Sequence, residues 1–140
     1  MFRKIDSAEH RAAHTFAHED SVRSMLKLKD LGKKISIITG APTFIAELEI
    51  KKLERTSYDH YTCLRDDGPY AKKPDPRGMH FVLEKLQHKP HETLYIGNSN
   101  EDAEFAKNAG CDFLYLERKE HEFENTDWMV GVIESLDELF

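Results

Sequence analysis

The chain has 140 residues, of which 39% are hydrophobic and 33% are charged, and its formal net charge is −6. This length suits one domain with a core of its own, and the composition predicts a soluble globular protein. The sequence lacks the roughly 18–20 consecutive apolar residues of a membrane span, the apolar segment of a signal peptide and the basic block that binds nucleic acid, so it favours none of these classes.

Residues 1–20 are expected to be helical or irregular, and they carry three histidines spaced four residues apart. His10, His14 and His18 would share one face of a helix. Imidazoles at this spacing bind Zn²⁺ in some proteins, whereas the charged residues around them favour a solvated polar surface. We prefer the solvated surface and keep the metal site as an alternative.

From residue 21 onward, short apolar runs alternate with helical periodicity. Strands are predicted at 35–38, 60–64, 93–96 and 112–116, with a short fifth at 128–132. Helices are predicted at 21–31, 43–53, 77–86, 100–108 and 133–140, with Gly32 and Gly110 as C-caps. This alternation indicates βαβ units, a parallel sheet and a single α/β domain over residues 1–140.

Two cysteines, Cys63 and Cys111, are spaced unlike metal ligands. Two isolated thiols in a chain of this type favour a reduced compartment. We therefore expect a cytoplasmic protein.

In a parallel sheet, ligands gather where the strands end. The first strand ends at Thr39-Gly40, just before a helix. A hydroxyl and backbone N–H groups at such a position can hold a phosphate. A plain turn explains the same two residues.

The segment Lys72-Lys73-Pro74-Asp75-Pro76 precedes the helix predicted at 77–86. Its prolines restrict the backbone, which would hold a lysine ammonium rigidly at the edge of a site. An ammonium there can neutralise a phosphoryl group. The alternative is a solvated charged loop.

The strand at 93–96 is followed by Gly97, and Asn98, Glu101 and Asp102 come next. Mg²⁺ prefers oxygen ligands, which carboxylate and amide side chains supply. Alternatively, Asn98 caps the following helix and Glu101 completes a capping box.

These three motifs occur in one order: a strand with Thr-Gly, a Lys-Pro pair whose lysine lies 34 residues after Thr39, and a strand with Gly-Asn-x-x-x-Asp. In this order the chain resembles the haloacid dehalogenase-like (HAD) phosphatase superfamily over about residues 21–118. The resemblance implies a Rossmann-like three-layer sandwich with a mostly parallel sheet. It also implies Mg²⁺-dependent transfer of the phosphoryl group of a small phosphorylated metabolite, a phosphate monoester, to an aspartate. By position, Thr39 and Gly40 would bind the phosphoryl group, Lys73 would stabilise it, and Asn98 and Asp102 would hold the metal.

The resembled family begins with a strand followed by Asp-x-Asp, and this pattern does not occur in the 140 residues. The nearest candidate nucleophile is Asp6, whose partner position is Ala8. Covalent catalysis needs an attacking group, so we expect this chain alone to have little or no phosphatase activity. A non-catalytic phosphate-binding or interaction module is the alternative, and a chain that starts downstream of the true start is another.

In the resembled family the first strand lies between those that here end at Thr39 and Gly97. Without it, two inner strands would keep unpaired backbone groups, which is costly. Three outcomes are expected: the two strands pair directly, residues 1–5 fill the gap, or another chain covers it, either a second copy or a different protein.

Overall fold

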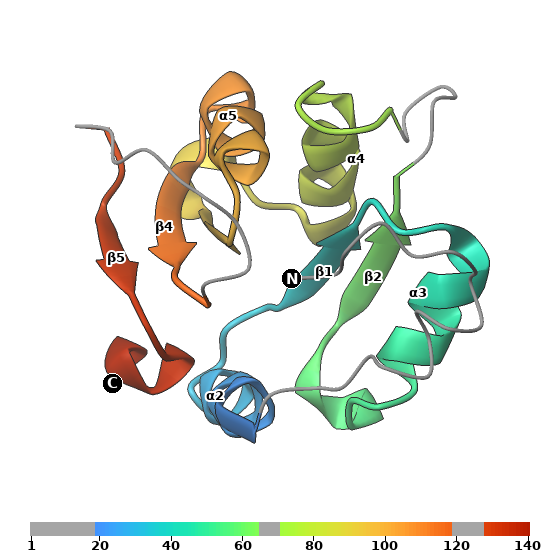
Figure 1. The fold of residues 1–140 in the computed structure, drawn as a ribbon, viewed down its shortest axis with the longest axis vertical. Coiled ribbons are helices and arrows are strands. Elements are labelled where there is room, and N and C mark those ends of the chain that lie inside the picture. The colour runs from blue at the N-terminus through green and yellow to red at the C-terminus, as the bar shows by residue number, and fades with distance from the viewer. Residues whose placement is uncertain (1–18, 65–70, 119–127) are drawn as a thin grey trace.

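A computed structural model of the chain describes residues 19–64, 71–118 and 128–140. Asp6, the three spaced histidines and the segment 1–5 therefore lie outside the described residues. The helices are α2 (Glu19–Asp30), α3 (Thr43–Ile50), α4 (Arg77–Leu86) and α5 (Asn100–Ala109). The strands are β1 (Ser36–Thr39), β2 (His60–Cys63), β3 (Leu94–Gly97), β4 (Asp112–Leu116) and β5 (Gly131–Ile133), and short 3-10 turns are η1 (Arg55–Ser57), η3 (Pro90–Glu92) and η4 (Leu136–Leu139) (Figure 1).

The predicted alternation of strands and helices is confirmed, and β4 and α4 have the predicted bounds. Gly32 and Gly110 follow α2 and α5 with φ of 80° and 81°, a left-handed conformation that favours glycine, so both predicted helix ends are confirmed.

The predicted C-terminal helix over 133–140 is wrong. Ile133 is the last residue of strand β5 and not the first of a helix. Its carbonyl accepts a hydrogen bond from the Glu117 N–H at 2.7 Å, just beyond β4. Only Leu136–Leu139 turns, as a 3-10 helix capped by the Ser135 side chain. A long-range strand pairing has overridden a local preference for helix.

The strands form two sheets, β1-β2 and β3-β4-β5, and each pairing among the described residues is parallel. The parallel α/β class is thus confirmed. Direct pairing of β1 with β3, one of the three expected outcomes for the sheet gap, does not occur. Instead, Ile38 of β1 and Tyr95 of β3 both pack against the same core cluster.

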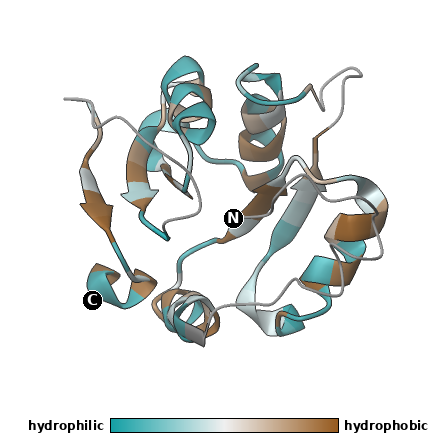
Figure 2. Ribbon diagram, viewed as in Figure 1, coloured by the Kyte–Doolittle hydropathy of each residue, from teal (hydrophilic) through white to brown (hydrophobic). Residues whose placement is uncertain are grey.

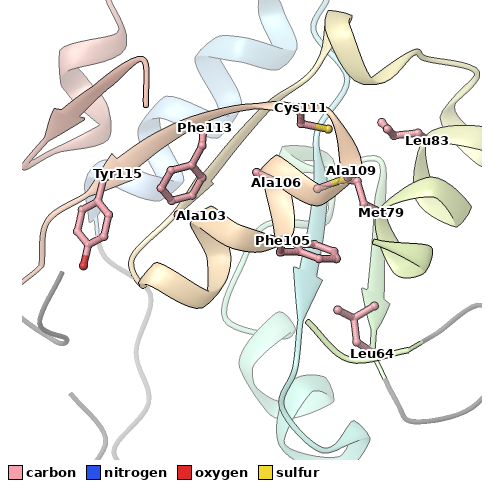
Figure 3. Close-up of a cluster of buried hydrophobic side chains, with 10 residues drawn as sticks. All are labelled: Leu64, Met79, Leu83, Ala103, Phe105, Ala106, Ala109, Cys111, Phe113 and Tyr115. Atoms are coloured by element: carbon pink, nitrogen blue, oxygen red, sulfur yellow. The ribbon is translucent and has the colours of Figure 1, made fainter. Parts of the chain in front are cut away.

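That cluster lies between the strands and helices α4 and α5, and it holds most of the largest buried side chains (Figure 3). Its buried members are Leu64, Met79, Leu83, Ala103, Phe105, Ala106, Ala109, Cys111, Phe113 and Tyr115. Figure 2 shows that β1 is largely hydrophobic, as expected for a strand that contributes to a core.

Helix α3 covers the opposite face of β1 and β2. Its residues Ile45 and Ala46 form a second small cluster with Ala41, against which Cys63 packs. Side chains alternate between the faces of a strand, so Ile38 faces α4 and α5 while Thr39, the register partner of Cys63, faces α3. Helices thus flank the strands on both sides, as in a three-layer α/β fold.

Among the described residues, none of the helices combines the length and the apolar character needed to cross a bilayer.

Candidate functional site

A nearly buried ion pair lies where β3 ends and α5 begins. Lys73 Nζ is 2.7 Å from Asp102 Oδ1, and the two side chains are 14% and 8% exposed. Lys73 comes from the loop before α4, whereas Asp102 lies in the first turn of α5. The structure therefore brings together two of the residues that the sequence assigns to different motifs.

Local hydrogen bonds fix the position of Asp102. Its N–H donates to the Ser99 hydroxyl at 3.1 Å, and its Oδ2 accepts from the Asn98 N–H, also at 3.1 Å. The N-cap of α5 is thus Ser99, not Asn98. The side chain that accepts a hydrogen bond from the backbone before the helix belongs to Asp102, not to Glu101. The capping alternative from the sequence was right in kind but misplaced by one residue.

Two tyrosines that are not among the predicted site residues hold the same strand end. The Tyr95 hydroxyl is 3.4 Å from Asp102 Oδ1 and 3.5 Å from Lys73 Nζ. The Tyr115 hydroxyl donates to the Asn98 carbonyl at 2.9 Å. Burial and the charge of Asp102 raise the pKa of Tyr95 well above its usual range, so this hydroxyl keeps its proton.

The Lys73 loop is anchored on both sides. Asn108 near the end of α5 donates to the Pro74 carbonyl at 3.0 Å. On the other side, Gly78 in α4 packs so closely on Leu64 and on the Ala71 carbonyl that a Cβ there would lie 2.4 Å from Leu64 Cδ2. These contacts give the ammonium a defined place.

Thr39 and Gly40 lie at the end of β1, next to this anchor. The Thr39 carbonyl accepts from the Leu64 N–H at 2.8 Å, and the Leu64 side chain lies against Gly78 of α4, close to the Lys73 segment. The Thr39 hydroxyl accepts from the Ala41 N–H at 3.1 Å, which leaves its own proton for a ligand. Gly40 is exposed and faces open space.

The structure does not join all the predicted site residues. Among the described residues, neither Thr39 nor Gly40 has a hydrogen bond to Lys73 or Asp102. The phosphate-binding roles of Thr39, Gly40 and Lys73 remain predictions, as does metal binding by Asn98 and Asp102.

The described donors do not by themselves fit a Mg²⁺ ion. The Asp102 carboxylate already holds an ammonium and a backbone N–H, and Asn98 is neutral. Within the described ranges, no group of three or more His, Cys, Asp or Glu side chains is placed to hold a metal. Mg²⁺ favours charged oxygen ligands in octahedral geometry, which this set does not supply.

The fold and the ordered motifs define an α/β domain with a charged pair at the end of a parallel strand. The family model described as a haloacid dehalogenase-like hydrolase matches residues 1–110, and the chain belongs to this family. The predicted family and its Rossmann-like fold are therefore confirmed.

Similar proteins include phosphatases. The chain is 30% identical to a phosphoglycolate phosphatase from Vibrio cholerae over 105 residues, which cover 73% of this chain and 44% of the relative. It is 29% identical to the pyrophosphatase PpaX from Bacillus mycoides over 102 residues, which cover 73% of this chain and 47% of the relative. The chain thus spans less than half the length of these relatives.

Solved structures show the same fold. The crystal structure of a HAD phosphatase from Thermococcus onnurineus superposes with a TM-score of 0.76 at 24% identity, covering 94% of this chain and 60% of the other. At this identity the likeness concerns the fold alone.

Proposed function

We propose that this chain provides the phosphate-binding part of a HAD-family phosphatase site that acts on a small phosphate monoester. The observation that carries the proposal is the Lys73–Asp102 pair, a charged and nearly buried group at the end of a parallel strand. Ligands of parallel α/β proteins gather at such strand ends.

Each residue has a role that follows from its chemistry. The Lys73 ammonium neutralises negative charge on the phosphoryl oxygens, and Asp102 keeps it in place. The Thr39 hydroxyl donates its remaining proton to a phosphoryl oxygen, and the Gly40 backbone lets the ligand approach closely because its surroundings are open.

Turnover by this chain alone is expected to be small. The 140 residues contain no Asp-x-Asp pair, and phosphate-binding groups do not replace an attacking nucleophile. We also expect weak Mg²⁺ binding, because the described donors amount to one paired carboxylate and one amide.

The gap between β1 and β3 suggests where a further strand belongs. In the two described sheets, β1 pairs only with β2 and β3 only with β4, so each has one edge free of strand partners. We propose that residues 1–5, a second copy or another chain covers these edges, since unpaired inner strands are costly.

The second candidate is a non-catalytic phosphate-binding or interaction module. The neutral Asn98 and the pairing of Asp102 with Lys73 favour it, because both reduce the charge available to a catalytic metal.

Calorimetric titration with inorganic phosphate, together with turnover of an aryl phosphate in Mg²⁺, tests the proposal and separates the two candidates. We expect saturable binding that is lost in Lys73→Met and retained in Lys89→Met, a matched control at an exposed lysine outside the site. Binding without turnover supports the non-catalytic module. Turnover that Lys73→Met abolishes supports a phosphatase and contradicts the expected inactivity. Absence of binding in the unmodified chain contradicts a phosphate site in either candidate and leaves only a non-catalytic interaction module.

A further inference from the structure

The Tyr95 hydroxyl lies at the meeting point of the two charged groups of the site. It is 3.4 Å from Asp102 Oδ1 and 3.5 Å from Lys73 Nζ, and these two atoms are 2.7 Å apart. A phenolic hydroxyl can donate to the carboxylate and accept from the ammonium at the same time. Three separate elements, β3, α5 and the loop before α4, thus supply one hydrogen-bonded group.

The aromatic ring cannot swing away from this position. It packs edge-on against Phe105 with ring centres 5.4 Å apart, and it lies tilted on Phe113 at 6.2 Å. Both phenylalanines are 0% exposed. Because close-packed cores hold side chains in one rotamer, the hydroxyl stays beside the ion pair.

A lysine side chain is flexible, and its ammonium has three N–H groups. Asp102 accepts from one of them and Tyr95 from a second, which leaves one for a ligand. We propose that Tyr95 is a positioning residue that holds the Lys73 ammonium against Asp102 and directs its remaining N–H toward a bound anion. The identity of that anion, a phosphate group, rests on the proposed function.

The substitution Tyr95→Phe removes the hydroxyl and keeps the ring, and Tyr61→Phe on β2 is the matched control. Two measurements on the full chain decide the matter: the hydrogen exchange rate of the Lys73 ammonium by nitrogen-detected NMR, and the Kd for inorganic phosphate. We expect faster ammonium exchange and a Kd raised about five-fold in Tyr95→Phe, the effect of one lost hydrogen bond, with Tyr61→Phe unchanged. Exchange and Kd equal to those of the unmodified chain in both variants would mean that only the ring matters, and would overturn the proposal.

The two proposals fail separately. If the unmodified chain binds no phosphate, the proposed function is wrong, whereas the ammonium exchange rate still tests Tyr95. If circular dichroism shows that Tyr95→Phe does not fold, the role of Tyr95 is tested by NMR of the unmodified chain. A slowly exchanging Tyr95 hydroxyl proton with a nuclear Overhauser effect to the Lys73 side chain supports positioning, and a hydroxyl proton in free exchange with water overturns it.

Discussion

Asp102 lies directly over the backbone of Gly97. A Cβ at position 97 would come 2.5 Å from Asp102 Cβ and 2.7 Å from its Oδ2. Both contacts are shorter than real Cβ atoms make. The glycine at the end of β3 therefore provides the space in which the Lys73–Asp102 pair forms.

We predict that Gly97→Ala lowers the free energy of unfolding by about 2 kcal/mol, because a buried clash must displace the start of α5. Urea unfolding measures this loss. Gly40→Ala is the control, since a Cβ at Gly40 has no described atom within 4 Å. It should change stability by less than about 1 kcal/mol in either direction. Equal effects of the two substitutions would contradict the close approach of Asp102.

Asp20 should make stability depend on pH in acid. Burial alone raises the pKa of its carboxyl, but hydrogen bonds from the Leu136 N–H, Arg118 and Ser135 outweigh burial and lower the pKa from 3.8 to about 2. A lowered carboxyl pKa stabilises the fold above the unfolded value and loses this contribution as pH falls toward the folded value. The loss, about 2 kcal/mol, should occur between pH 3.8 and about 2.

Comparison of the unmodified chain with Asp20→Asn isolates this effect from that of other acids. The free energy of unfolding, measured in urea across this pH range, should fall less steeply in the variant. Parallel curves would show that the contact of Asp20 with Arg118, at 2.8 Å, does not lower its pKa.

Phe105 should be the most sensitive position of the core, because its ring is 0% exposed and lies in the cluster between α5 and the strands (Figure 3). We predict that Phe105→Ala costs about 3–5 kcal/mol, enough to unfold a marginally stable domain. Phe44→Ala, at a ring that is 53% exposed, should cost less than about 1 kcal/mol. Thermal melts of both variants, followed by circular dichroism, check the contrast. A folded Phe105→Ala with an unchanged melting temperature would contradict the position of the core.

The two cysteines should differ in reactivity. Burial raises the pKa of the Cys111 thiol to about 11, so only about one molecule in a thousand carries the thiolate near pH 8. Cys63 is half-buried. A disulfide reagent should modify Cys63 in the folded protein and Cys111 only after unfolding, as peptide mass spectrometry would show. Rapid modification of Cys111 under native conditions would place it outside the core.

The sequence alone predicted the fold well wherever its pattern was local. Strand ends at Thr39 and Gly97 follow from short apolar runs that stop at a glycine, and Gly110 follows from the backbone conformation of a helix end. The C-terminal segment failed because Ile133 pairs with β4, a contact between residues distant in sequence.

The charged residues of the site could be predicted from the sequence, whereas the residues that hold them in position could not. Lys73 and Asp102 belong to ordered motifs, so their types and spacing point to them. Tyr95 looks like any core aromatic, because only the structure shows which way its hydroxyl points. Its place two residues before Gly97, on the same face of β3, was the one available indication. Adjacent Asn98 and Ser99 can both cap a helix, so the choice between them depends on the bond that Asp102 makes.

The central claim is that Thr39, Gly40 and Lys73 form one phosphate site, although no described hydrogen bond joins them. The most direct test is a titration of the full chain with inorganic phosphate, followed through the backbone amide NMR signals of Thr39 and Gly40. The claim predicts saturable shifts of both signals that disappear in Lys73→Met and persist in Lys89→Met. Unmoved signals, or shifts that survive Lys73→Met, would contradict it.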